Sequence, residues 1–167
     1  MFLNAFPLLP CTTSSAGAMA CTATLTGHGD IVISVVFHPT LAATLASASA
    51  DNTVKLWNIV TGECTTTLTG HREAVLSVVF HPTQAAVLAS ANSDSTVKLW
   101  NIHTGECTAT LRGHGDEVYS VVFHPTQPAV LASASEDKTV RLWNMPGLAA
   151  GVHEVSLFKN CLFPWKL

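Results

Sequence analysis

The amino-acid sequence predicts an all-β protein built from three copies of a four-stranded antiparallel unit. The first observation is an internal repeat: DNTVKLWN at residues 51–58 returns at 94–101 and at 137–144, each copy 43 residues after the last. The second is that every copy holds four short segments with strand character, separated by turn residues. The third is length, because 167 residues suit one compact domain or a short repeat array.

The first half of a copy predicts two strands and a turn. IVISVVFHP at residues 31–39 is apolar and rich in β-branched residues, and it ends at Pro39, which cannot donate to a strand ladder. TLASAS at 44–49 predicts a second, short strand. The polar residues at 51–53 predict a turn, in which an Asp side chain can bond to the backbone two residues further on.

The second half of a copy predicts two more strands. In residues 53–58, polar and apolar positions alternate with the period of a half-buried strand. TGEC at 61–64 predicts a turn, and the Thr-rich segment at 64–71 predicts a fourth strand that runs into the next copy. Four short strands in a period of about 40 residues are typical of one blade of a β-propeller.

Three Gly-His pairs, at residues 27–28, 70–71 and 113–114, precede the LASAS-D--TV-LW core of each copy. With this spacing, the chain resembles the WD-repeat family of β-propellers over about residues 21–144. The resemblance implies four-stranded antiparallel blades, three of which would form an open or incomplete propeller. One departure is regular, since the Asp that follows Trp in the family is Asn here, and Asn is a common variant at that position: Asn58, Asn101 and Asn144.

The pattern divides the chain into three regions. Residues 1–20 contain no charged side chain and are expected to form a disordered leader; a signal or transit peptide is the alternative, because Ala18-Met19-Ala20 resembles a cleavage site. Residues 146–167 form a divergent apolar tail with no assigned role. Between them, residues 21–145 hold a spare fourth strand and the three repeats, at 21–26, 27–69, 70–112 and 113–145.

The resemblance also implies a hydrogen-bonded set of four side chains, here called a tetrad, inside each blade. Its members are the His of the Gly-His pair, a Ser of the second strand, the Asp of the following turn and the Trp of the third strand. They are His28, Ser47, Asp51 and Trp57; His71, Ser90, Asp94 and Trp100; and His114, Ser133, Asp137 and Trp143. Ser49 and Ser135 are alternatives for the serine, but Asn92 stands at that position in the second copy.

Two kinds of chemical site are alternatives to this structural interpretation. A Ser, a His and an Asp in each copy raise the hypothesis of a hydrolase, but a nucleophile needs an exposed hydroxyl and an oxyanion hole, and a set repeated three times with an indole favours a brace. A second series, His38, His81 and His124, lacks the Cys or carboxylate partners of a Zn²⁺ site and is interpreted as turn histidines. We therefore expect no enzyme activity, no metal and no cofactor.

Charge and cysteine content limit the classes of partner and the cellular location that the sequence favours. Net charge is −3, and the eight Lys and Arg residues are scattered, so neither nucleic acid nor an acidic membrane surface is favoured. No apolar stretch approaches the roughly 20 residues that a membrane span needs. The five cysteines form neither a CxxC motif nor a disulfide framework, which favours reduced thiols and a cytoplasmic or nuclear location.

The resemblance implies a scaffold that binds a protein or peptide through the loops at the rim of the blades. The corresponding positions flank the Gly-His pairs and the start of each first strand: Asp30, Ile31, Ile33, Arg72, Glu73, Leu76, Asp116, Glu117 and Tyr119. A cullin-ligase adaptor is not indicated, because the Arg of its Trp-Asp-x-Arg signature is replaced by Val60, His103 and Pro146.

The number of copies leaves two further expectations open. Closed propellers have about 4–8 blades, so three copies also fit a truncated propeller without independent function. Alternatively, the spare strand at residues 21–26 and the missing fourth strand of the third copy would let two chains exchange strands in a six-blade homodimer.

Overall fold

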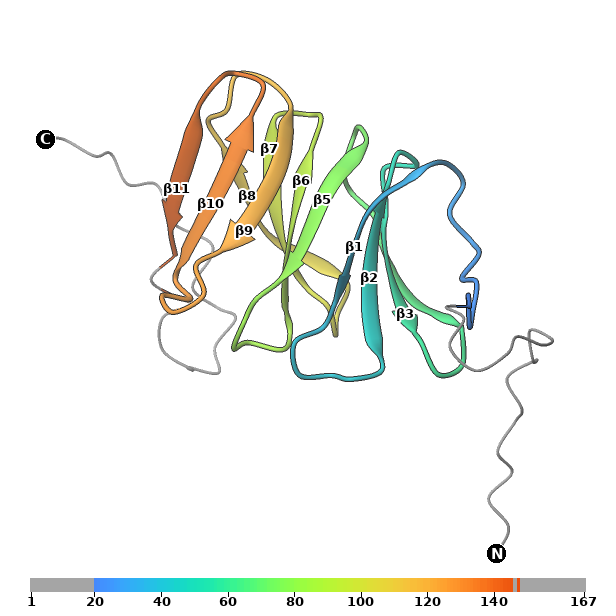
Figure 1. Cartoon of the computed structure of the whole chain (residues 1–167). Coiled ribbons are helices and arrows are strands. Elements are labelled where there is room, and N and C mark those ends of the chain that lie inside the picture. The colour runs from blue at the N-terminus through green and yellow to red at the C-terminus, as the bar shows by residue number, and fades with distance from the viewer. Residues whose placement is uncertain (1–19, 146, 148–167) are drawn as a thin grey trace, which may run out of the picture.

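The structure is a computed structural model that describes residues 20–145 and 147. These residues form eleven β-strands in three antiparallel sheets, which stand side by side in an open arc (Figure 1). Within each sheet, strands that follow one another in the chain are hydrogen-bonded neighbours. The predicted all-β fold class and the four-stranded unit are confirmed in the first two sheets, and the third sheet has three strands.

Each sheet corresponds to one blade. Blade 1 contains β1 (Val32–Phe37), β2 (Thr44–Ser49), β3 (Val54–Asn58) and β4 (Cys64–Leu68). Blade 2 contains β5 (Val75–Phe80), β6 (Val87–Asn92), β7 (Thr96–Asn101) and β8 (Glu106–Arg112). Blade 3 contains β9 (Val118–Phe123), β10 (Val130–Ser135) and β11 (Val140–Asn144).

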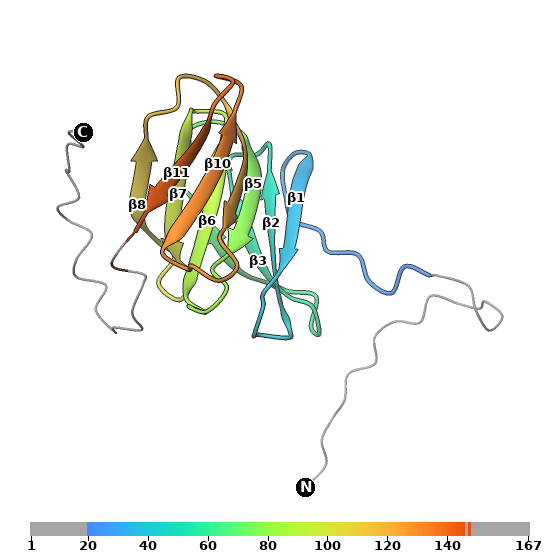
Figure 2. The same cartoon turned by 60° about the vertical axis from the view of Figure 1, so that its left-hand side comes forward.

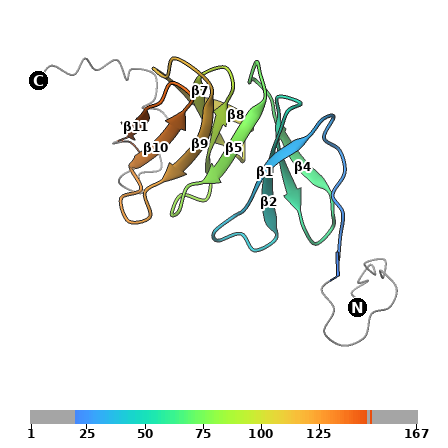
Figure 3. The ribbon, with the colours of Figure 1, turned by 45° about the horizontal axis from the view of Figure 1, so that its top comes forward.

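The first strands β1, β5 and β9 lie next to one another along the arc, and the sheets fan out from them (Figure 3). Blade 2 lies between the other two, face towards face (Figure 2). The hydrophobic core therefore lies between blades. One cluster joins Ala46, Ala48, Val54 and Leu56 of blade 1 to Val75, Val78 and Phe80 of blade 2. The second cluster repeats this packing one blade further along.

Backbone conformation and packing both explain why glycine stands in each Gly-His pair. Gly27, Gly70 and Gly113 have φ angles of 144°, 133° and 154°, a region that L side chains rarely adopt. A Cβ at these positions would also lie 3.4–3.6 Å from the rim of the Trp ring in the same blade. The pair therefore brings the chain close over the tryptophan and sets the following histidine beside it.

The predicted spare strand is not formed in this single chain. Residues 21–26 are among the described residues, yet they carry no strand and pair with no sheet. The equivalent strands β4 and β8 pair with the third strand that precedes them, and no strand precedes residues 21–26 in the described part of the chain. The leader at 1–19 and the tail at 146 and 148–167 lie outside the described residues, and the predictions for them stay predictions. In the part of the chain that the structure describes, no helix is long and apolar enough to span a bilayer.

Candidate functional site

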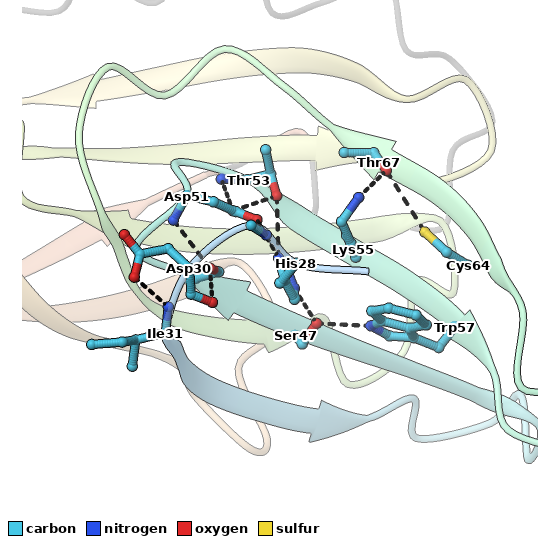
Figure 4. Close-up of polar contacts among 12 residues, drawn as sticks. His28, Asp30, Ile31, Ser47, Asp51, Thr53, Lys55, Trp57, Cys64 and Thr67 are labelled. Atoms are coloured by element: carbon cyan, nitrogen blue, oxygen red, sulfur yellow. Dashed lines mark hydrogen bonds and ion pairs between the residues drawn. The ribbon is translucent and has the colours of Figure 1, made fainter. Parts of the chain in front are cut away.

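The tetrad of blade 1 is fully connected (Figure 4). His28 Nδ1 lies 2.7 Å from Asp51 Oδ2, His28 Nε2 lies 2.7 Å from Ser47 Oγ, and Trp57 Nε1 donates to Ser47 Oγ at 2.8 Å. A neutral imidazole satisfies all three bonds when Nδ1–H donates to the carboxylate and the serine hydroxyl donates to Nε2. These hydrogen bonds thus link the Gly-His loop, β2, the following turn and β3.

Asp51 is the charged member of the blade 1 tetrad and accepts further hydrogen bonds. Its oxygens take the Gly29 N–H at 2.9 Å, the Thr53 N–H at 3.0 Å and the Thr53 hydroxyl at 2.7 Å. Burial acts to raise the pKa of Asp51, but the bonds from Thr53, Gly29 and His28 outweigh it and hold that pKa well below its usual value. The carboxylate therefore stays ionised, which strengthens its bond to the histidine.

Blade 3 repeats the arrangement of blade 1. His114 lies 2.7 Å from Asp137 and 2.8 Å from Ser133, and Trp143 Nε1 donates to the Ser133 hydroxyl at 2.8 Å. The Gly115 N–H donates to Asp137 at 3.1 Å. The hydroxyl of Thr139, more than any other group, holds the pKa of Asp137 below its usual value.

Blade 2 departs from the predicted tetrad. His71 Nε2 lies 2.6 Å from Ser90 Oγ, and Trp100 Nε1 donates to the same oxygen at 2.8 Å. Asp94, however, bonds to the backbone N–H and hydroxyl of Thr96 and not to the histidine, and the buried His71 Nδ1 has no hydrogen-bond partner among the described residues. The predicted bond between His71 and Asp94 is therefore wrong, while the other two bonds of this tetrad are present.

Two sequence differences accompany the missing bond between His71 and Asp94 in blade 2. Arg72 replaces the glycine whose N–H holds the Asp carboxylate in blades 1 and 3, and no such bond is formed by Arg72. Asn92 replaces Ser49 and Ser135, and its longer side chain joins Glu73 O at 2.6 Å to the Asp94 N–H at 2.6 Å. In the outer blades, Ser49 and Ser135 accept the N–H of the tetrad Asp, so they support the turn and are not members of the tetrad.

The burial of His71 predicts that the stability of the fold depends on pH. Burial lowers the pKa of His71 from 6.5 to about 4, and the Asp94 carboxylate opposes this only in part. The unfolded chain therefore takes up a proton near pH 6.5 that the folded chain refuses until about pH 4. This part of the stability is complete above pH 6.5 and is lost as the pH falls from 6.5 towards 4.

As the pH falls from 7 to 5, we expect the burial of His71 to lower the free energy of unfolding by about 2 kcal/mol. Urea unfolding at both pH values checks this. In His71→Gln the loss between the two pH values should shrink by about that amount. His103→Gln, at an exposed turn histidine, is the control and should keep the parent's dependence. An unchanged pH dependence in His71→Gln would contradict the assignment.

The second histidine series has a role that the sequence interpretation missed. His38 Nε2 donates to Ala85 O of blade 2 at 2.9 Å, and His81 Nε2 donates to Pro128 O of blade 3 at 3.0 Å. Both rings are buried and pack on a Phe of the next blade, with centroids 4.5 and 4.7 Å apart. Their Nδ1 atoms accept turn N–H groups, as expected of turn histidines, but the residues also join adjacent blades. Their recurrence beside Phe was the available signal.

Among the described residues, no three His, Cys, Asp or Glu side chains come close enough together to hold a metal ion. The tetrad serines are buried, and each already bonds to a tryptophan and a histidine. Lys55 and Lys98 donate to threonines of the neighbouring strand, Thr67 and Thr110.

The predicted partner-binding residues gather at one end of the blades, at the upper edge of Figure 1. This loop face is defined by the segments before β1, β5 and β9 and by the turns between the second and third strands of each blade. Backbone bonds tie the two sets together: Ala50 N–H to Ile31 O, Ser93 N–H to Ala74 O, and Glu136 N–H to Glu117 O, all at 2.9–3.0 Å.

The loop face is acidic and partly apolar. It carries two cations, Arg72 and Lys138. They are outnumbered by five exposed or half-buried carboxylates: Asp30, Glu73, Asp116, Glu117 and Glu136. Ile31 is 70% exposed and Tyr119 is 51% exposed, whereas Leu76 is half-buried. The Tyr119 hydroxyl donates to Glu136 at 2.5 Å, and this bond, above all, raises the pKa of Tyr119 to about 12.

Comparison with known proteins agrees with the blade geometry. The WD domain, G-beta repeat family matches residues 19–58, 62–101 and 105–144, which together are more than half of the chain. The chain belongs to the WD40 repeat family. The second and third matches begin with the fourth strand of the preceding blade, so that 62–101 spans β4 to β7. The first match, 19–58, covers residues 21–25, which form no strand, and then β1 to β3.

Individual relatives match over about one repeat. A coronin-like protein of Saccharomyces cerevisiae is 54% identical over 39 residues, and a coronin-like protein of Schizosaccharomyces pombe is 55% identical over 40 residues. The coatomer subunit beta'-3 of Arabidopsis thaliana is 50% identical over 40 residues. These matches span 23–24% of this chain and 4–7% of the length of the relatives.

Proposed function

We propose that this WD40 repeat protein is a non-catalytic scaffold whose loop face binds a basic segment of a protein partner. The observation that carries the proposal is the cluster of five carboxylates around exposed apolar side chains at one end of the blades. Carboxylates there would attract lysine or arginine, and Ile31, Ile33 and Tyr119 would contact the apolar parts of the segment.

A rigid support favours this function. Side-chain bonds fix the loop face across the blade boundaries: Asn52 Nδ2 donates to Arg72 O at 3.3 Å, and Ser93 Oγ donates to Glu117 Oε2 at 3.2 Å. A surface held in this way loses little conformational entropy when a partner binds. The buried tetrads support the same interpretation, because their serines are shielded from any substrate and therefore act as braces.

Charge reversal on the loop face tests the proposal. A fluorescent peptide of alternating Lys, Arg and Leu serves as the probe, and its dissociation constant is measured by anisotropy. Glu73→Lys with Asp116→Lys should weaken binding about tenfold or more, since like charges would then face the peptide. Glu63→Lys with Glu106→Lys changes the net charge equally at the opposite end of the blades and should leave the affinity near the parent's.

Three results would count against the proposal. Equal weakening in both double variants would show that net charge alone attracts the peptide. Equal affinity for a peptide with Glu in place of Lys and Arg would show that carboxylates do not select the partner. Absence of binding to any probe would favour the alternative of a propeller fragment without independent function.

A further inference from the structure

Blade 1 exposes a surface that is buried in the other two blades. Val75, Val78 and Phe80 of β5 are 0–4% exposed, because they pack on the preceding blade. The equivalent side chains of β1, 43 residues earlier, are Val32, Val35 and Phe37, and they are 52–64% exposed. We call the surface of these three residues the head face. Its chemistry is that of a blade interface with the covering blade absent.

Blade 3 exposes the complementary surface. Val97 and Leu99 of β7 are each 1% exposed beneath blade 3. Their equivalents on β11, Val140 and Leu142, are 69% and 74% exposed. We call the surface of Val140, Leu142 and the half-buried alanines of β10 the tail face. Within the chain, surfaces of the head type cover surfaces of the tail type twice, at both blade boundaries.

The inter-blade histidines repeat the same relation. His38 packs on Phe80 and His81 packs on Phe123, and each donates to a carbonyl in the next blade. The third member, His124, is exposed, and among the described residues its Nδ1 bonds only to its own turn and its Nε2 to no group. If a head face covered the tail face, the repeat predicts that His124 would pack on Phe37 and donate to the carbonyl of Ala42, the equivalents of the groups that His38 and His81 meet.

Residues 21–25 carry the third complementary feature. They repeat CTATL of β8, and they already hold its local geometry: Cys21 Sγ donates to Ala23 O at 3.2 Å, as Cys107 Sγ does to Ala109 O at 3.3 Å. Cys21 Sγ also lies 3.9 Å from Thr24 Oγ1, against 3.7 Å in β8. The segment thus repeats the local side-chain contacts of a fourth strand without being paired to a sheet, while the outer edge of β11 has no partner strand among the described residues.

We propose that two copies of this chain join head to tail into a closed six-blade ring, in which residues 21–25 of each copy become the fourth strand of the other's blade 3. The register follows from β7 and β8, where Lys98 faces Thr110 and Leu99 faces Ala109. The repeat converts these pairs into Arg141 with Thr24, and Leu142 with Ala23, of the second copy. Head-to-tail contacts close when the rotation permits, and six blades lie within the range of closed propellers.

Solution mass is the first test. Light scattering after gel filtration should give twice the 17.6 kDa of the chain. Phe37→Glu and Leu142→Glu should each lower the mass to that of one chain, because each places a charge in the proposed interface. Val60→Glu is the matched control, since Val60 is 64% exposed like Phe37 but lies in the turn after β3, and it should stay dimeric.

Disulfide trapping tests the register. In a chain with its five native cysteines replaced by Ser, Thr24→Cys and Arg141→Cys on separate copies should form a mixed disulfide dimer on oxidation. Thr22→Cys with Arg141→Cys lies two residues out of register and should trap far less. Thr24→Cys alone should not link to itself.

Several outcomes would overturn the proposal. A single-chain mass for the parent at all concentrations would exclude the ring, and assemblies larger than two copies would exclude closure. Dimers that persist in both interface variants, or that trap through Thr24→Cys alone, would place the contact elsewhere. None of these readouts depends on peptide binding at the loop face, so this proposal and the proposed function can fail separately.

Discussion

Replacing Ser90 by Ala is expected to lower the free energy of unfolding by about 3 kcal/mol or more. Ser90 is completely buried, and its hydroxyl bonds both to Trp100 Nε1 at 2.8 Å and to His71 Nε2 at 2.6 Å. Alanine would leave two buried polar groups unpaired, each costing about 1–3 kcal/mol. Because His71 Nδ1 already lacks a partner, the imidazole would then have no hydrogen bond at all.

Urea unfolding, followed by tryptophan fluorescence at pH 7, measures this effect. Ser77→Ala is the matched control, since Ser77 is a half-buried residue of β5 in the same blade and should change stability by less than about 1 kcal/mol. If Ser90→Ala unfolded at the same urea concentration as Ser77→Ala, the shared serine hydroxyl would not be the centre of the brace.

The aspartates of blades 1 and 2 should differ sharply when each is replaced by Ala. Asp51→Ala removes the carboxylate that binds His28, Gly29 and Thr53, and we expect a loss of about 2–3 kcal/mol. Asp94→Ala also unpairs a threonine, Thr96, but removes no bond to His71, so we expect a loss about 1 kcal/mol or more smaller than that from Asp51→Ala.

The two aspartate variants act as controls for each other, because they occupy equivalent turns of nearly identical blades. Both are measured by urea unfolding at pH 7. A further variant, Arg72→Gly with Asn92→Ser, gives blade 2 the residues of the outer blades and should make Asp94→Ala as costly as Asp51→Ala. Equal losses from Asp51→Ala and Asp94→Ala in the parent would contradict the difference between the blades.

Much of the fold could be predicted because its signals are local. The alternation in residues 53–58 and the turns at 51–53 and 61–64 depend on a few neighbouring residues, and the 43-residue repeat supplied them three times. Strand ends differ slightly from the prediction, since β1 begins at Val32 and the predicted strand began at Ile31. Membership of the tetrads came from the family resemblance, and the choice of Ser47 over Ser49 agrees with the hydrogen bonds observed.

The all-β class, the repeat unit, the family and the residues able to form the tetrads could thus be read from the chain's local pattern alone. Three features depend on the three-dimensional packing: among the described residues His71 Nδ1 has no partner, His38 and His81 join neighbouring blades, and the apolar faces at the two ends of the arc are exposed. The reason is physical: residues of the same type at equivalent positions differ only in what a segment 19–47 positions away places beside them. Val54 and Val140 occupy the same position in the repeat, yet the first is buried and the second is exposed, because only the first has a blade packed against it.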